Sequence, residues 1–282
     1  MAQNEIIMKI RLIILSLALS AATLSAQDYT WEPGKIDGSR TGCGIPSTTN
    51  VEAAVGKVVR GKYYAPDGSI FKKNSATART ASLVLAAQPA MARVKEVVAH
   101  STREMSKGYP ESELSNWFVD IMIRKAEALS GRKVHMGIVN FGGIRADMPE
   151  GDVILDDLFS MFPFKNQITY VEHKGSTIRS ILENMAAGRF QVLGGVRVVA
   201  QDGRLVSVEI DGQPLEDDKV YGLATVNFLL YGGDGLKLAE DAVNLVKYDV
   251  DVIDAVLEHV YAETAAGRPI EYQTDGRVTI IR

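Results

Sequence analysis

The sequence has 282 residues, of which 46% are hydrophobic and 23% are charged, so it can form one large domain or two small ones. The formal net charge is −4 at pH 7, and lysine and arginine are scattered along the chain, which argues against a nucleic-acid partner. Four histidines and one cysteine exclude a cysteine-rich zinc site.

The first 26 residues have the pattern of a secretory signal peptide. Lys9 and Arg11 precede an apolar run over 12–19, and small residues follow up to Ala26. The run is too short to span a bilayer, and a buried helix is the alternative. We therefore expect an exported protein, periplasmic or extracellular, with no membrane span after cleavage. Cys43 would then be a free or buried thiol, because it has no partner in the chain.

Residues 27–90 are expected to form an irregular N-terminal segment. They are rich in Gly, Ser, Thr and Lys, and turn signals such as Pro66-Asp67-Gly68 interrupt them. One strand is predicted near Val55–Tyr64.

Apolar residues recur at helical spacing in three later segments, which predicts helices over 114–129, 178–185 and 252–261. For the second of these, Ser176 and Thr177 are the candidate N-caps and Gly188 is the expected end.

Short apolar runs predict the strands between these helices. Two of the runs flank Gln201-Asp202-Gly203, which indicates a hairpin. The mixture of helices and strands, with at least one hairpin, favours an α/β or α+β class with a mixed sheet. The predicted strands are Val134–Asn140, Gln167–Glu172, Val196–Ala200, Arg204–Ile210, Val220–Val226 and Val278–Ile281.

No catalytic or metal-binding motif is recognisable in the sequence. The four histidines lie far apart, and neither an H-x-x-x-H nor an Asp-x-His spacing occurs. A G-x-S-x-G nucleophile elbow is also absent. No catalytic or metal-ligating residue is therefore assigned to this chain.

Three loops have residues suited to binding a ligand. The first, Asn140–Arg145, follows a strand and has two glycines before an arginine, which suits a close backbone approach and a carboxylate or phosphate. The second, Phe162–Asn166, has an aromatic after Pro163. The third, Asn227–Gly235, joins an aromatic to a glycine-rich turn with an aspartate. Taken singly, each is also compatible with a tight turn or a core aromatic.

In this order the loops closely resemble the C-terminal domain of the 5'-nucleotidase family. The resemblance lies in Asn-x-Gly-Gly-Ile-Arg, Pro-Phe-x-Asn, Gly-Gly-Val and Asn-Phe-x-x-x-Gly-Gly-Asp-Gly, and it is strongest from Glu111 to Asp234. It implies a mixed-sheet domain layered with helices over 91–282.

In that family the C-terminal domain clamps the nucleotide, while a separate N-terminal domain holds two metals. By resemblance, Asn140 and Arg145 contact phosphate or ribose, and Phe164 and Phe228 sandwich the base. Asp234 accepts from the ribose hydroxyls. Asn166 and Gly195 would contact the base edge.

The chain departs from the family in two respects. Residues 27–80 are too few for the metallophosphatase half, so no cofactor is expected here and divalent metals are expected only in a separately encoded partner. The arginine that the family usually has before the first helix is also missing from the segment 109–116. The resemblance therefore implies a nucleotide-binding subunit that serves a separate metallophosphatase. One alternative is a stand-alone nucleotide- or nucleoside-binding protein without hydrolysis, and another is a degenerate structural domain that has lost its ligand.

Overall fold

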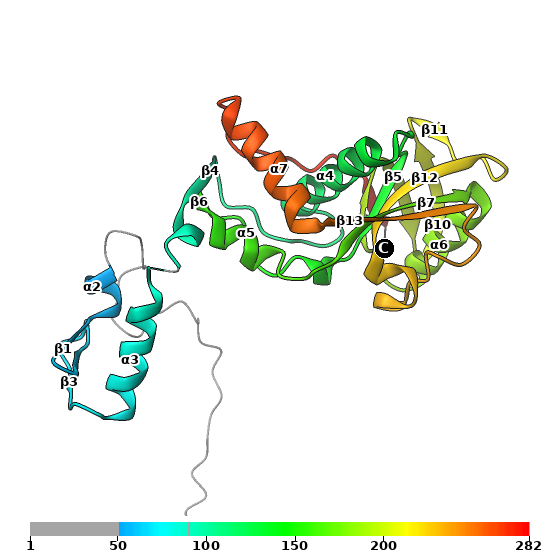
Figure 1. The fold of residues 1–282 in the computed structure, drawn as a ribbon. Coiled ribbons are helices and arrows are strands. Elements are labelled where there is room, and N and C mark those ends of the chain that lie inside the picture. Colours follow the sequence, from blue (N-terminus) through cyan, green and yellow to red (C-terminus); the bar gives the residue numbers. More distant parts are fainter. Residues whose placement is uncertain (1–50, 90, 282) are drawn as a thin grey trace, which may run out of the picture. The chain divides into compact units, whose positions relative to one another are not determined.

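The computed structural model describes residues 51–89 and 91–281, so the predicted signal peptide and Cys43 lie outside the described residues. The chain divides into two compact units, Met1–Ser82 and Leu83–Arg282 (Figure 1).

The described part of the first unit is regular, which corrects the expectation of an irregular segment there. Its antiparallel sheet has the strand order β1-β2-β3, and helix α3 crosses the division between the units. The single strand expected over Val55–Tyr64 is a hairpin, because Arg60 and Gly61 both have positive φ and turn the chain back. The elements are α2 (Val51–Val55), β1 (Lys57–Val59), β2 (Lys62–Tyr64), β3 (Ile70–Phe71) and α3 (Ala76–Ala87).

The centre of the second unit is a five-stranded sheet with the strand order β13-β7-β12-β5-β8. Its strands β12 and β5 are parallel and the other neighbours are antiparallel, so the predicted mixed sheet is confirmed. The strands are β5 (Met136–Val139), β7 (Gln167–Lys174), β8 (Val192–Gly194), β12 (Val220–Val226) and β13 (Asn244–Asp251).

Helix α4 (Glu113–Ser130) confirms the first predicted helix. Ser112 and Ser115 form a capping box at its start, and Gly131 ends it in the left-handed conformation with φ 63°. The helix packs across β5, β8 and β12. Glycine is needed in the strands beneath it, since a Cβ on Gly137 or Gly194 would lie 2.8 Å from the side chain of Val119.

Helix α6 (Gly175–Ala187) ends at Gly188 as predicted, but its predicted N-caps are wrong. It begins at Gly175 without a side-chain cap, because carbonyls of the 217–219 turn accept its first N–H groups: Gly175 N donates to Lys219 O and Ser176 N to Asp217 O. Helix α7 (Val252–Ala265) confirms the third predicted helix.

A second sheet of four strands has the order β11-β10-β9-β14. The predicted hairpin joins β9 to β10, and β14 lies parallel to β9. Helix α6 packs against β10. Strands β4 and β6 form a separate two-stranded sheet, and α7 packs against β4 while α5 packs against β6. The remaining elements are β4 (Val97–Ser101), β6 (Gly151–Ile154), α5 (Leu155–Met161), β9 (Val196–Gln201), β10 (Arg204–Ile210), β11 (Gln213–Pro214) and β14 (Val278–Ile281).

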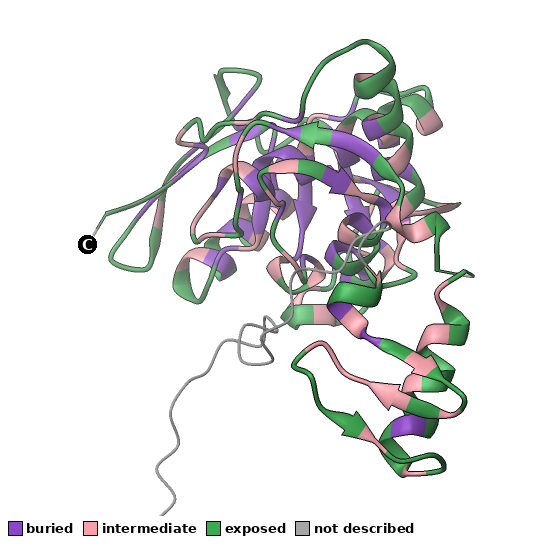
Figure 2. Ribbon diagram, turned by 90° about the vertical axis from the view of Figure 1, so that its left-hand side faces the viewer, coloured by how far each residue is buried: buried purple, intermediate pink, exposed green. Residues whose placement is uncertain are grey.

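Buried residues are concentrated in strands β5, β7, β8 and β12 of the five-stranded sheet and in the helix faces turned toward them (Figure 2). Val119, Ile138 and Leu223 are fully buried in this core. Exposed residues dominate the loops. Within residues 51–89 and 91–281, no helix is both long enough and apolar enough to cross a bilayer.

Candidate functional site

The three candidate loops meet at one edge of the five-stranded sheet. Because β5 and β12 are parallel, their carboxyl ends share this edge, and antiparallel β7 begins there. Val226, the last residue of β12, pairs with Ile168 near the start of β7. The two loops are also joined directly, since Gln167 N donates to Asn227 Oδ1 over 3.0 Å. Topology therefore gathers residues that lie far apart in sequence.

The segment 140–145, called the glycine loop below, follows β5 as a short 3-10 turn. Asn140 is buried at its start, and Gly143 N donates to Asn140 O over 3.0 Å. Arg145 N donates to Met161 O over 2.9 Å, which fixes the other end of the loop. A Cβ on Gly143 would lie only 3.0 Å from Asn140 Oδ1, so glycine gives the amide its space.

Asp234 lies beside the glycine loop. Its own turn requires positive φ at Gly232, Asp234 and Gly235, which explains the glycine-rich sequence. A Cβ built on Gly142 would be 3.3 Å from Asn140 Nδ2 and 3.8 Å from Asp234 Oδ2. The side-chain amide of Asn140, a donor, and the carboxylate of Asp234, an acceptor, thus both lie beside Gly142, which has no side chain. This arrangement suits a ligand with two adjacent hydroxyl groups.

The two candidate stacking rings are accessible to solvent. Phe164 is 44% exposed and Phe228 is 45% exposed, whereas Phe162 is 3% exposed and packs on Phe118. The core interpretation of the Pro163 loop therefore fits Phe162 and not Phe164. The ring of Phe228 rests against Gly233, where a Cβ would be 2.8 Å from the ring.

Arg145 is exposed, and its guanidinium carbon lies 5.8 Å from the centroid of the Phe164 ring. Asn166 is half-buried, and its carbonyl accepts from Val252 N at the start of α7 over 2.8 Å. Asn140, Phe164 and Asn166 line a narrow crevice of about 10 Å³ between the loops.

Gly195 is not brought to this edge. In the antiparallel pair β5-β8, Val139 faces Val192 at the site and Gly137 faces Gly194 toward the other end. Gly195 has φ 68°, and a Cβ there would be 2.3 Å from the carbonyl of His135, so glycine is required by the turn. The structure therefore gathers the other six predicted residues and leaves Gly195 apart.

Sequence reasoning missed the segment 105–110, which runs beside the glycine loop. Met105 and Met148 exchange backbone hydrogen bonds, and Lys107 Nζ donates to Ile144 O over 2.7 Å. The ring centroids of Tyr109 and Phe141 are 6.1 Å apart. No motif marks this segment, and only the proximity of the two aromatics shows its place at the site.

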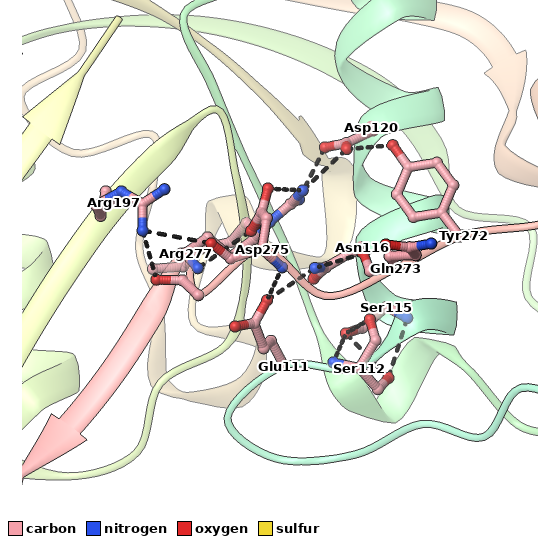
Figure 3. A network of polar contacts seen from close by, with 12 residues as sticks. Glu111, Ser112, Ser115, Asn116, Asp120, Arg197, Tyr272, Gln273, Asp275 and Arg277 are labelled. Carbon is pink, nitrogen blue, oxygen red and sulfur yellow. Dashed lines mark hydrogen bonds and ion pairs between the residues drawn. The ribbon is translucent and has the colours of Figure 1, made fainter. Parts of the chain in front are cut away.

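A polar network begins at Glu111, directly after that segment in the sequence (Figure 3). Glu111 Oε2 accepts from Asn116 Nδ2 over 2.8 Å and from Asp275 N over 3.4 Å. Arg277 binds Asp120 with both of its terminal nitrogens, at 2.9 and 3.1 Å. The network ties the start of α4 to the chain before β14.

Burial disfavours the charged form of Arg277, but its hydrogen bonds to Asp275 and Asp120 outweigh burial and raise the pKa of the guanidinium. Tyr272 donates to Asp120 Oδ2, and burial together with this bond raises the pKa of the phenol to about 12. Both groups therefore keep their charge state throughout the physiological pH range. Among the residues that the structure describes, no three His, Cys, Asp or Glu side chains gather as a metal site.

Comparison with known families gives a match to the model described as "5'-nucleotidase, C-terminal domain" over residues 90–241, more than half of the chain. Among curated proteins, bovine 5'-nucleotidase is 30% identical over 181 residues, which cover 55% of this chain and 31% of that protein. Protein UshA of Yersinia enterocolitica is 31% identical over 129 residues, covering 43% of this chain and 24% of that protein. The chain thus spans only about a quarter to a third of these relatives.

Solved structures give the same result. A 5'-nucleotidase precursor from Thermus thermophilus superposes with a TM-score of 0.64 and 25% identity, over 77% of this chain and 45% of that one. The NAD nucleotidase of Haemophilus influenzae superposes with a TM-score of 0.57 at 19% identity, over 78% of this chain and 48% of that one. The second likeness concerns the fold alone.

Proposed function

Since this chain belongs to the family of 5'-nucleotidase C-terminal domains, we propose that it is a nucleotide-binding unit. The observation that carries the proposal is the pair of half-exposed rings, Phe164 and Phe228, on joined loops beside Asn140, Arg145 and Asp234. Two aromatic rings can bind a base between them by stacking, because every base has a π face. The amide and carboxylate at Gly142 suit ribose hydroxyls, and Arg145 suits phosphate.

We further propose that hydrolysis of the phosphate ester takes place on a metallophosphatase centre outside this chain. Binding the base and sugar would position the phosphate for that centre, since contacts to the non-reacting part of a substrate can be used to orient the reacting part. The signal-peptide pattern over 1–26 supports an exported site of action, periplasmic or extracellular.

If this chain binds the nucleotide and a separate metallophosphatase hydrolyses it, the purified chain alone should not hydrolyse AMP when zinc, manganese or cobalt is added. The reason is that the sequence has no metal-ligand spacing with which to activate a water. Phosphate release is the measurement. Metal-dependent turnover that co-elutes with the chain, and is removed by substituting Asp234 or Asn140, would contradict the proposal.

Arg145→Ala should weaken AMP binding by about ten- to a hundredfold, because a charge-assisted hydrogen bond contributes about 1.5–3 kcal/mol. Adenosine, which has no phosphate, should be affected less. Calorimetric titration of both ligands in phosphate-free buffer measures the two ratios. Equal losses for AMP and adenosine would assign Arg145 to the support of Phe164 instead.

A further inference from the structure

Arg189 occupies the turn between α6 and β8, at the same sheet edge as the site. Val192 of β8 pairs with Val139 of β5, so residues 188–191 lie level with the glycine loop. The turn is held there, since Phe141 N donates to Gln191 Oε1 over 3.2 Å. Arg189 therefore approaches the glycine loop from the β8 side.

The guanidinium of Arg189 rests on two aromatic rings. Its central carbon is 4.6 Å from the ring centroid of Tyr109 and 6.0 Å from that of Phe141. Such cation–π contacts hold the plane of a guanidinium against the rings and leave its N–H groups free to donate hydrogen bonds. With the residues that the structure describes, Arg189 makes these ring contacts but no hydrogen bond or ion pair, so its N–H donors remain available.

The other cations near the loop are placed differently. Lys107 already donates to Ile144 O, and Arg145 lies over Phe164 on the β7 side. Positions 108–111, between Lys107 and the start of α4, are Gly, Tyr, Pro and Glu, so these four residues supply no cation. Arg189 is thus the basic side chain that the structure stacks on the Tyr109 side of the loop.

We propose that Arg189 is a specificity-determining residue that binds the phosphate of a nucleotide, with Tyr109 and Phe141 holding its guanidinium in place. This inference rests on the proposed function. A nucleotide's phosphate is its strongly anionic group, and a planar guanidinium with free donors binds phosphate through two parallel hydrogen bonds. Arg145 within the glycine loop and Arg189 beside the loop then both bind phosphate, and the chain prefers nucleotides to nucleosides.

The test is calorimetric titration of the full chain and of Arg189→Gln with AMP and with adenosine. Arg189→Gln should weaken AMP binding by about ten- to a hundredfold and leave adenosine binding unchanged. Arg189→Lys keeps the charge without the planar guanidinium, so its affinity for AMP should lie between that of the wild type and that of Arg189→Gln. Arg204→Gln, which removes an exposed arginine at the start of β10 in the other sheet, is the matched control and should bind both ligands like the wild type.

The outcomes separate this inference from the proposed function. If Arg189→Gln binds AMP like the wild type, or weakens AMP and adenosine equally, the role of Arg189 is overturned while nucleotide binding stands. If the wild-type chain binds neither ligand, both proposals fail together. Because Arg189 is exposed, the melting temperature of the variant should match the wild type, so a folding defect is separately visible.

Discussion

Replacing Phe164 or Phe228 by alanine should weaken adenosine binding by about five- to two-hundredfold, because stacking contributes about 1–3 kcal/mol per ring. The double variant should bind more weakly than either single variant. Since both rings are nearly half exposed, the free energy of unfolding should change little. Calorimetry with adenosine and urea unfolding of the same samples measure the two effects.

Two controls define the result. Phe162→Ala removes a buried ring from the same loop and should cost about 3–5 kcal/mol of stability. Tyr231→Ala removes a ring that is 70% exposed from the same loop as Phe228 and should not alter binding. Folded Phe164→Ala and Phe228→Ala variants that bind adenosine like the wild type would show that the loops match the family in sequence without forming a base site.

The helices and most central strands could be predicted because their patterns are local. Period 3.6 marks α4 and α7, and the mostly apolar segment Val220–Val226 marks β12. Strand β13 was not predicted, because its sequence carries Lys247 and Asp249 along a partly exposed edge of the sheet. The start of α6 was mispredicted because its cap comes from the distant 217–219 turn.

The site was predictable to the extent that its residues sit in glycine-marked loops. Asn140, Arg145 and Asp234 lie in such loops, and the structure brings them to one edge. Gly195 shares the glycine signal but serves a turn at the opposite end of β8, which only the strand register reveals. Tyr109 and Arg189 have no local signal, because they join the site through ring contacts across 80 residues of sequence, from 109 to 189.

The polar network around Arg277 is expected to contribute strongly to stability. The side chain of Arg277 is 8% exposed and that of Asp120 is 20% exposed, so their ion pair is largely shielded from water. Removing one partner of such a pair leaves an uncompensated buried charge. Glu111 and Asp275 connect the pair to the chain that carries Tyr109, so the effect should extend to the Arg189 side of the site.

Arg277→Leu should therefore lower the free energy of unfolding by about 3–5 kcal/mol, measured by urea denaturation at pH 7. The double variant Asp120→Asn/Arg277→Leu removes both charges of the ion pair and keeps an acceptor for Tyr272. Its free energy of unfolding should fall by less than that of Arg277→Leu alone. Arg268→Leu is the control, because its ion pair with Glu263 is exposed, and it should change stability little.

The pH dependence should identify the same network. The hydrogen bond from Arg277 holds the pKa of Asp275 below its ordinary value of 3.8, so this contribution is present at neutral pH and is lost as the pH falls through the lowered pKa. Arg277→Leu should accordingly reduce the loss of stability that the wild type shows below pH 4. An Arg277→Leu variant that unfolds at the wild-type urea concentration, with the same acid dependence, would show that water screens these charges and that the network does not hold the segment before β14.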